Sequence, residues 1–504
     1  MKNDKENIYI KREQDWRNGA IVYQVLVDRF APSTDLENKK HLYQYPKTLK
    51  TWDELPKRGS FVEDAKYWSH ELEYWGGDLK SLMAKISYLK NLGIDVLYLN
   101  PIFESVSNHK YDATNYLNIS SEYGTKEDLS ILTNKLHELG IKVVLDGVFN
   151  HVGVQNDLYV KAKNHDPNYR HWFDFNEKYP EGVRLWADAK SLPELNLEHE
   201  DVKQYIYKAE DSVLKTYLKL GIDGWRLDVA FDLGYDILKD LTTEAHKEKE
   251  GSLIVGEIWN YPQKWLTSID AVMNFTLREI IYRSIRNQIS AKNGLQMITK
   301  MIDDAGIEGI LKSWNVLDNH DVKRLKNEFN DERDQKIAQL LQFTLPGSPN
   351  LYYGTELGMQ GADDPKNRAP MRWDLLKDDN QCYGWIKKLV ALHHQHRALK
   401  IGDFKALMGD TLFGFERYTN KVEDSIFVII NLTDHEVEDS LLVPNSDIMN
   451  YSSFSMFLGE ESKVEFIAGL LKVKLESKSF MVIKPNVRAE KSYSPYKRII
   501  GKAS

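Results

Sequence analysis

The chain has 504 residues, of which 42% are hydrophobic and 28% charged, an ordinary composition for a globular protein with a large core. Its net charge of −8 lacks the basic excess typical of proteins that bind nucleic acid or anionic membranes, so we expect neither partner. The single cysteine, Cys382, excludes an intrachain disulfide, and the first residues contain no apolar segment of the signal-peptide kind. These features predict a cytoplasmic protein.

The first half of the chain repeats one pattern, an amphipathic helix followed by a glycine and a short apolar strand. The three phrases are LGIDVLYLNP around Gly93, LGIKVVLDGVFNH around Gly140 and LGIDGWRLDVA around Gly221. The first helix is predicted to run from an N-cap at Asp78 to Gly93, and the second from a capping-box-like start at Thr125 to Gly140. The third helix is predicted from apolar residues at helical spacing, namely Val202, Ile206, Ala209, Val213, Tyr217 and Leu220.

This alternation predicts a parallel sheet in an α/β protein. Eight segments are candidate strands: 21–28, 94–100, 141–146, 222–228, 252–257, 270–275, 313–318 and 349–353. A doubly wound sheet and a barrel both fit the alternation, and the number eight favours the closed (β/α)₈ TIM barrel.

The chain is predicted to contain two further units besides the barrel. Gly140 and Gly221 lie farther apart than Gly93 and Gly140, which indicates a small inserted domain after the third strand, at residues 152–199. The barrel then comprises residues 1–151 and 200–396. Short β-rich segments bounded by turn residues predict a C-terminal antiparallel β-sandwich domain at 397–487, followed by a basic tail at 488–504.

Four acidic residues fall at the carboxyl ends of predicted strands, the end at which TIM barrels carry their active sites. They are Asp146, Asp228, Glu257 and Asp321, and Arg226, His151 and His320 lie beside them in the sequence. A single acid at a strand end is usually a cap or a surface residue, but four at one level indicate a site. Converging carboxylates can bind a divalent metal, stabilise a cationic sugar or divide the acid and nucleophile roles in glycoside cleavage.

Arg226 favours the last of these chemistries. A fixed positive charge opposes a metal ion, whereas it helps to keep a neighbouring aspartate ionised, as a nucleophile must be. Asp228 shares one strand face with Arg226 and is therefore the expected nucleophile. Glu257 lies between Val255 and Ile258 with no cation next to it in the sequence, so it is the expected proton donor.

The chain resembles the α-amylase family of glycoside hydrolases over roughly residues 20–485. Four motifs carry the resemblance: DGVFNH (146–151), GWRLDVA (224–230), GEIW (256–259) and NVLDNHD (315–321). The resemblance implies that Asp228 forms a β-glycosyl-enzyme intermediate, that Glu257 is the general acid and then the base, and that Asp321 binds the 2- and 3-hydroxyls of the −1 sugar. It further implies that Arg226, His151 and His320 orient these groups and bind that sugar, and that Asp146 holds Arg226.

Within the family, the chain is similar to the neopullulanase, cyclomaltodextrinase and maltogenic amylase branch. The carrying segments are PIFESVSNHKYDATNY (101–116), LPELN (192–196) and DDPKNR (363–368). This similarity implies that His109 and Tyr111 contact the −1 sugar and that Asp364 and Arg368 bind sugars towards the non-reducing end. Trp259, at the end of GEIW, completes the predicted substrate-binding set together with Phe231.

The sequence departs from the branch pattern in three respects. The first predicted barrel strand begins near residue 21, so we expect no N-terminal β-sandwich. Because that domain builds the dimer in the branch, the oligomeric state is left open as monomer or homodimer. Phe231-Asp232 stands where relatives often carry Lys-His or Asn-Glu near the +1 and +2 sugars. Asn150 matches one calcium-ligand position of α-amylases, but Asn196 replaces an aspartate there, so we expect at most a weak structural calcium and no required cofactor.

The sequence predicts hydrolysis of α-1,4 and in addition α-1,6 glucosidic bonds in maltooligosaccharides, with retention of configuration. Two alternatives remain. A transglycosylase or sugar isomerase of the same family differs only in what resolves the intermediate. A non-catalytic carbohydrate-binding relative is disfavoured, because Asp228, Glu257 and Asp321 are all present.

Overall fold

The computed structural model describes residues 2–486. Its centre is a closed barrel of eight parallel strands, which confirms all eight predicted strands. In chain order the strands are β1 (Val22–Val25), β6 (Val96–Leu99), β9 (Lys142–Gly147), β10 (Gly224–Leu227), β11 (Leu253–Ile258), β12 (Ala271–Asn274), β13 (Trp314–Val316) and β14 (Ser348–Tyr352). Each strand pairs with its neighbours in chain order, and β1 closes the barrel against β14.

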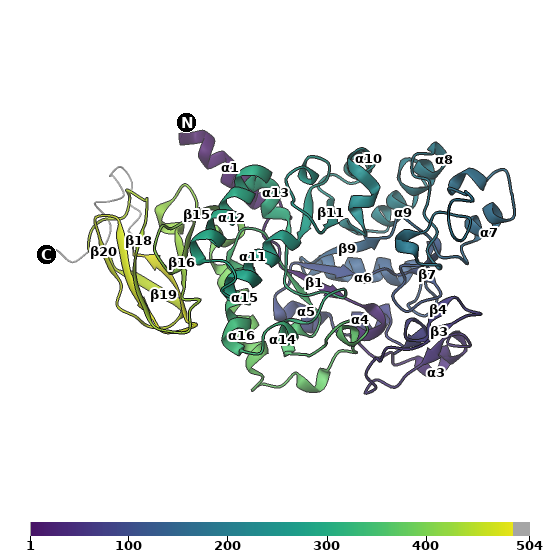
Figure 1. The fold of residues 1–504 in the computed structure, drawn as a ribbon, viewed down its shortest axis with the longest axis horizontal. Helices are drawn as coiled ribbons and strands as arrows, with labels where there is room; N and C mark the ends of the chain where they lie inside the picture. Colours follow the sequence, from purple (N-terminus) through teal and green to yellow (C-terminus); the bar gives the residue numbers. More distant parts are fainter. Residues whose placement is uncertain (1, 487–504) are drawn as a thin grey trace.

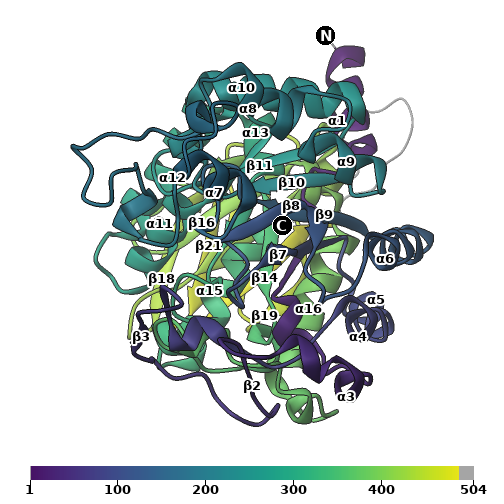
Figure 2. The same ribbon diagram turned by 90° about the vertical axis from the view of Figure 1, so that its right-hand side faces the viewer.

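Helices surround the barrel, as Figure 2 shows. Their apolar faces pack on the outward-facing strand residues and form the largest core. The helices of this ring are α4 (Leu79–Met83), α5 (Ile86–Leu92), α6 (Lys126–Glu138), α8 (Glu200–Lys203), α9 (Val213–Lys219), α10 (Ala230–Glu248), α11 (Phe275–Ile285), α12 (Ala291–Ala305), α13 (Ile307–Lys312), α14 (Leu325–Glu328), α15 (Glu332–Thr344) and α16 (Gln381–Gln395).

The predicted helix caps are present. The Asp78 side chain accepts the Ser81 N–H at the start of α4, and the Thr125 hydroxyl accepts the Asp128 N–H at the start of α6. Gly93 ends α5 in the left-handed region at φ 88°, where glycine carries no Cβ penalty.

Two of the predicted helices are interrupted, which corrects the expectation of single continuous helices. The first divides into α4 and α5. The third divides into α8, a π-helical turn (η5, Gln204–Lys208) and α9. At this second break the Lys208 carbonyl accepts a hydrogen bond from the Lys215 ammonium at 2.9 Å. The Ser212 N–H donates to the Ala209 carbonyl at 3.0 Å. A side chain therefore replaces the backbone partner that a continuous helix would supply.

Two long excursions lie at the barrel end opposite the C-terminal sheets (Figure 1). One is the segment after β9, which contains α7 (Asp157–Lys163) and the 3₁₀ turns η3 (Arg170–Trp172) and η4 (Trp186–Asp188). The other follows β1 and contains α3 (Leu36–Lys39), β2 (Thr48–Leu49), β3 (Phe61–Val62), β4 (Tyr67–Trp68), the 3₁₀ turn η2 (Ser69–Leu72) and β5 (Glu73–Tyr74). The hairpin β7 (Phe103–Ser105) and β8 (Ala113–Ile119) lies between them in the chain.

The C-terminal part is antiparallel, as predicted. One sheet contains β15 (Asp403–Ala406), β16 (Phe413–Tyr418), β17 (Ile426–Ile430), β22 (Phe480–Pro485) and β19 (Phe454–Gly459), and the other contains β18 (Val437–Leu442), β21 (Leu470–Leu475) and β20 (Glu465–Ile467). Residues of both sheets share one separate hydrophobic core. The domain boundaries drawn from the sequence stay predictions, and the tail at 488–504 lies outside the described residues.

The structure adds an element that sequence analysis missed, the N-terminal helix α1 (Lys2–Gln14). Arg12 is buried and forms ion pairs with Glu308 at 2.6 Å and with Asp403 at 2.9 Å. This helix thus contacts both the barrel and the first strand of the C-terminal domain. Over residues 2–486, no helix is long and apolar enough to cross a membrane.

Candidate active site

A cavity of about 760 Å³ opens at the carboxyl ends of the barrel strands. Predicted site residues that line it are His109, Tyr111, His151, Asp228, Phe231, Glu257, Trp259, His320, Asp321, Asp364 and Arg368. The two remaining residues, Asp146 and Arg226, are buried in the barrel beneath it. The structure therefore brings together the entire predicted set, which comes from segments more than 200 residues apart in the chain.

Arg226 is the electrostatic centre of the site. Its guanidinium is fully buried and contacts three carboxyl groups: Nη1 lies 2.8 Å from Asp146 Oδ1 and 2.9 Å from Asp228 Oδ1, and Nη2 lies 2.9 Å from Glu257 Oε2. The Glu257 contact is an ion pair without an aligned hydrogen bond. The expectation that Glu257 has no cation beside it is wrong, because adjacent barrel strands place Arg226 of β10 next to Glu257 of β11.

The pKa of Asp228 is raised well above its usual value. Burial is the main cause, and the negative charges of Glu257, Asp146 and Asp321 add to it, whereas Arg226 opposes the rise. Burial also raises the pKa of Asp146 and of Asp321. Arg226 thus opposes a rise in pKa that burial and the neighbouring carboxyl groups cause, and its role in keeping Asp228 ionised stays a prediction. One guanidinium shared among three carboxyl groups does not neutralise them all, so the cluster favours retention of a proton.

The backbone between Asp228 and α10 is strained. Val229 adopts φ 39° and ψ 46°, a left-handed conformation that β-branched residues rarely take. In this conformation the Val229 N–H donates to Glu257 Oε2 at 3.0 Å. The other oxygen of Glu257 accepts the indole N–H of Trp259 at 2.9 Å. The turn thus fixes the positions of the expected nucleophile and the expected acid relative to each other.

Tyr111 and His320 line the cavity together with Glu257 and Trp259. Their rings stack at 5.5 Å with an interplanar angle of 4°, and the Tyr111 hydroxyl lies 2.7 Å from His320 Nε2 and 2.9 Å from Asp146 Oδ2. His320 Nδ1 faces the Gln24 amide nitrogen at 3.0 Å, which assigns the ring proton to Nε2. Burial lowers the pKa of His320 well below its usual value, so the ring is neutral and Nε2–H donates to the Tyr111 hydroxyl. Asp321 Oδ1 lies 3.2 Å from the same nitrogen.

Arg368 connects Asp321 to the far end of the cavity. Its guanidinium donates to the His320 carbonyl at 2.8 Å and lies 3.5 Å from Asp321 and 3.1 Å from Asp364. His109 accepts the Tyr111 N–H at 3.1 Å and its Nε2 lies 3.6 Å from Glu71. Burial lowers the pKa of His151 to about 3, and this neutral ring stacks on Trp186.

The sequence did not single out the wall that the β1 excursion supplies. Phe61, Glu63, Lys66, Trp68 and Glu71 all line the cavity. Trp68 is 41% exposed and contacts Phe61 edge-on at 5.6 Å. The aromatic residues of FVEDAKYWSHELEYW were the one available signal, but no periodicity or spacing relates this segment to strand ends far along the chain.

The inserted segment supplies the opposite wall through Trp186, Asp188, Ala189, Lys190, Ser191 and Leu192. The Trp186 indole donates to Asp232 at 3.1 Å, which explains why this chain carries an acid after Phe231. Asn150 is buried, its carbonyl accepts the Leu195 N–H at 2.9 Å, and it shares a second cavity with Asn196. The calcium at Asn150 stays a prediction.

The barrel carries two carboxyl groups beside a buried arginine at the carboxyl ends of its strands. This arrangement is typical of glycoside hydrolases built on a TIM barrel. The comparisons with known proteins agree. Residues 24–401 match the α-amylase catalytic domain. Neopullulanase 2 of Thermoactinomyces vulgaris is 31% identical over 460 residues, which cover 87% of this chain and 74% of the relative. The chain therefore belongs to the α-amylase family of glycoside hydrolases.

Two further similarities inform the proposals below. Intracellular maltogenic amylase of Bacillus subtilis (strain 168) is 32% identical over 395 residues, which cover 76% of this chain and 63% of that protein. The ligand-free structure of cyclic α-maltosyl-(1→6)-maltose hydrolase from Arthrobacter globiformis superposes with a TM-score of 0.77 over 93% of this chain and 100% of that one. At 24% identity the second similarity shows the fold alone.

Proposed function

We propose that this enzyme hydrolyses α-1,4-glucosidic bonds, and α-1,6 bonds in addition, in short maltooligosaccharides by double displacement. The observation that carries the proposal is the shared contact of Asp228 and Glu257 with Arg226 on adjacent strands at the cavity floor. Retention of configuration follows when one carboxyl group attacks the anomeric carbon and the other protonates the leaving oxygen from close by.

In the first step, a carboxylate oxygen of Asp228 forms a bond to C1 of the sugar as the bond from C1 to the glycosidic oxygen breaks. The Glu257 carboxyl group transfers its proton to that oxygen, and the shortened saccharide leaves. This division of roles requires one proton between the two carboxyl groups, carried by Glu257 while Asp228 is ionised. Asp321, held by Arg368 and His320, lies where it can bind two hydroxyls of the reacting sugar.

In the second step, ionised Glu257 accepts a proton from water as the water oxygen attacks C1 and the ester to Asp228 breaks. Two inversions at C1 restore the α configuration. Because the leaving group departs on the side of Glu257 and Trp259, the cavity half formed by Tyr111, His109 and Arg368 holds the retained sugars. None of these steps requires a metal ion.

The substrate class follows from the shape and lining of the site. A cavity of about 760 Å³ accommodates a few sugar rings rather than a long polymer, and aromatic side chains on both walls offer faces for pyranose stacking. The name of the maltogenic relative supports α-glucans as substrates. The intracellular relative and the single cysteine support a cytoplasmic location. We leave the assembly as monomer or homodimer.

Hydrolysis of 4-nitrophenyl α-maltoside tests the proposal. We expect Glu257→Gln to lower kcat/KM by roughly 10²–10⁴-fold, because the variant cannot donate or accept the transferred proton. Asp228→Asn is expected to abolish turnover, since the covalent intermediate no longer forms. The exposed α6 residue Glu127 provides the matched control, and Glu127→Gln should retain wild-type activity.

Two results would contradict the proposal: no release of nitrophenol by the wild type, or full activity in Glu257→Gln. Product analysis on maltotriose and panose in the same assay distinguishes hydrolysis from transglycosylation, because transfer yields saccharides longer than the substrate. Maltotriose tests the α-1,4 linkage, and panose includes an α-1,6 linkage as well.

A further inference from the structure

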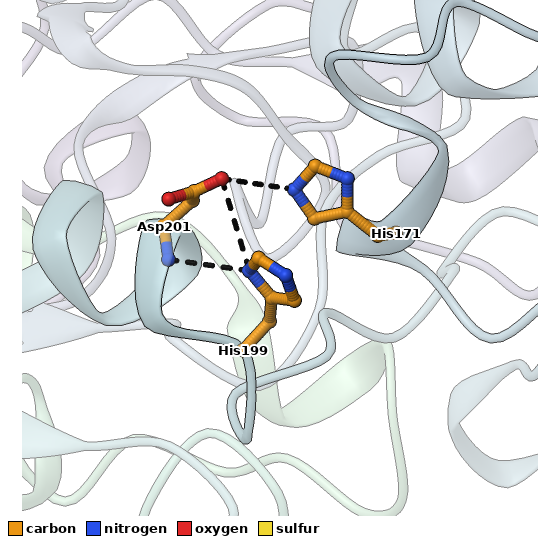
Figure 3. A group of neighbouring side chains, drawn as sticks. All are labelled: His171, His199 and Asp201. Carbon is orange, nitrogen blue, oxygen red and sulfur yellow. Dashed lines mark hydrogen bonds and ion pairs between the residues drawn. The ribbon is translucent and has the colours of Figure 1, made fainter.

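Three metal-ligating side chains meet where the inserted segment joins helix α8, outside the active-site cavity. His171 lies in the turn η3, and His199 and Asp201 lie at the start of α8 (Figure 3). Asp201 Oδ2 lies 3.0 Å from His171 Nε2 and 3.8 Å from His199 Nδ1. One ligand atom from each residue lies within 4.8 Å of the others.

Two electron-rich atoms of this cluster, His199 Nδ1 and Asp201 Oδ2, face each other without a proton between them. His199 Nδ1 accepts the backbone N–H of Asp201 at 3.2 Å, so this nitrogen carries a lone pair and no proton. That lone pair and the Asp201 carboxylate oxygen lie 3.8 Å apart, and the His171 ring approaches His199 to 4.0 Å between centroids. His171 Nε2 also shares a 3.0 Å hydrogen bond with Asp201 Oδ2. A cation bound by all three groups replaces this bond and attracts both the carboxylate and the lone pair of His199.

The donor set selects the kind of cation. Calcium takes six to eight oxygen ligands, whereas two imidazole nitrogens and one carboxylate oxygen suit zinc and similar late transition metals. Atoms bound to a tetrahedral zinc at about 2.0–2.1 Å lie about 3.3 Å from one another. Two of the three separations, 3.0 Å and 3.8 Å, lie on either side of this value, and the third is within 4.8 Å, so side-chain shifts are needed to bring all three atoms to one ion.

The site also lies where a metal would join the turn η3 of the inserted segment to the start of α8. Asn196 donates its side-chain N–H to the His171 carbonyl at 3.1 Å and its backbone N–H to the Trp172 carbonyl at 2.7 Å. Leu195 donates its N–H to the carbonyl of Asn150, the neighbour of the cavity residue His151. The cluster therefore adjoins the strip that supports one wall of the active site.

We propose that His171, His199 and Asp201 form a zinc-class metal site that stabilises the inserted segment, with water as the fourth ligand. The metal takes the lone pair of His199 Nδ1 and releases the Asp201 N–H that this atom now accepts. None of the three ligands lines the active-site cavity, so we assign the metal a stabilising role and no part in glycoside cleavage.

Isothermal titration of the full chain with zinc chloride, after chelator treatment and dialysis, tests the proposal. We expect one saturable zinc ion per chain, and at least about a tenfold loss of affinity in both His171→Ala and Asp201→Asn, because each removes one of three protein ligands. Zinc should raise the Tm of the wild type and slow proteolytic cleavage within residues 152–199. Calcium chloride should produce neither effect through these residues.

The matched control is His165→Asn, an exposed histidine of the same segment that lies outside the cluster. Its φ of 64° is one that asparagine tolerates, so the control should fold and bind zinc like the wild type. The chain has 14 histidines, and this control corrects for zinc bound elsewhere. Equal zinc affinity in His171→Ala and the wild type, with equal Tm values in chelator, would overturn the site. So would the absence of saturable zinc binding by the wild type.

Discussion

At the scale of single residues, the site depends on how one buried guanidinium is shared. Arg226 contacts Asp146, Asp228 and Glu257, and each carboxyl group weakens the hold of Arg226 on the other two. Asp146 also accepts the hydroxyls of Tyr98, at 2.5 Å, and Tyr111, so it is the most fully satisfied of the three. It acts on the reaction through Arg226 and is a positioning residue.

Removing the charge of Asp146 should change the pH dependence of the reaction. The negative charge of Asp146 contributes to the raised pKa of Asp228, so Asp146→Asn should lower that pKa. A lower pKa keeps the nucleophile ionised at lower pH, and the acid limb of the kcat/KM profile should therefore move to lower pH. The profile is measured with 4-nitrophenyl α-maltoside. Asp236→Asn on the exposed face of α10 is the control and should leave the profile in place.

An acid limb that stays fixed in Asp146→Asn, or that moves to higher pH, would show that Asp146 does not raise the pKa of Asp228. A structural defect alone would lower kcat/KM at every pH without displacing the limb.

At the scale of elements, the barrel supplies the chemistry and its excursions supply the walls. The β1 excursion carries Trp68. Its backbone N–H donates to Glu71 at 2.7 Å, and Glu71 in turn lies 3.6 Å from His109. These contacts connect Trp68 to the half of the cavity that holds the retained sugars. An exposed indole in a cavity of this kind is a stacking surface for a sugar ring.

Replacement of Trp68 should therefore affect binding more than chemistry. We expect Trp68→Ala to raise the KM for 4-nitrophenyl α-maltotrioside roughly two- to tenfold with little change in kcat, the pattern of a lost contact that is equal in ground and transition states. The KM for 4-nitrophenyl α-glucoside, which has a single sugar, should stay near the wild-type value. An equal KM change for both substrates would contradict this role.

The control for Trp68→Ala is Tyr261→Ala, which removes another exposed aromatic ring, 40% accessible, that does not line the cavity. It should leave both KM values unchanged.

At the scale of the whole molecule, a buried arginine joins the C-terminal sheets to the barrel. Arg417 of β16 donates to three carbonyl oxygens: Thr344 at the end of α15 at 2.7 Å, Gly402 at 2.9 Å and Asp403 at 3.3 Å. No carboxylate forms an ion pair with it within residues 2–486, and its hydrogen bonds all go to backbone carbonyl groups. The nearby charge of Asp403 favours its charged form. The bond to Thr344 crosses to the barrel, and the other two hold the guanidinium in place for it.

Arg417→Ala should destabilise the protein by roughly 2–4 kcal/mol, because three buried carbonyl groups lose a charged donor. The midpoint of urea unfolding, followed by tryptophan fluorescence, measures the change. Arg283→Ala, which removes an exposed arginine from α11, should shift the midpoint little. A midpoint in Arg417→Ala equal to that of the control would mean that the apolar interface suffices.

The sequence by itself determined the barrel and the level of the site within it. Apolar periodicity, helix caps such as Asp78 and Thr125, and acids at strand ends are local features, and parallel strands bring their carboxyl ends together whatever the details of packing. Only the tertiary structure decided that Arg226 contacts three carboxyl groups at once. The pairing and register of neighbouring strands set the distances from its guanidinium to Asp146, Asp228 and Glu257.

Tertiary structure also decided what surrounds the site. The wall carrying Trp68 and the cluster of His171, His199 and Asp201 depend on loops whose paths follow from packing rather than from periodicity. The strained Val229 and the interrupted helices likewise break local preferences, and long-range contacts such as the bond from Val229 to Glu257 offset that cost. Local rules therefore predicted the framework, and contacts between distant segments set the charges and the shape of the site.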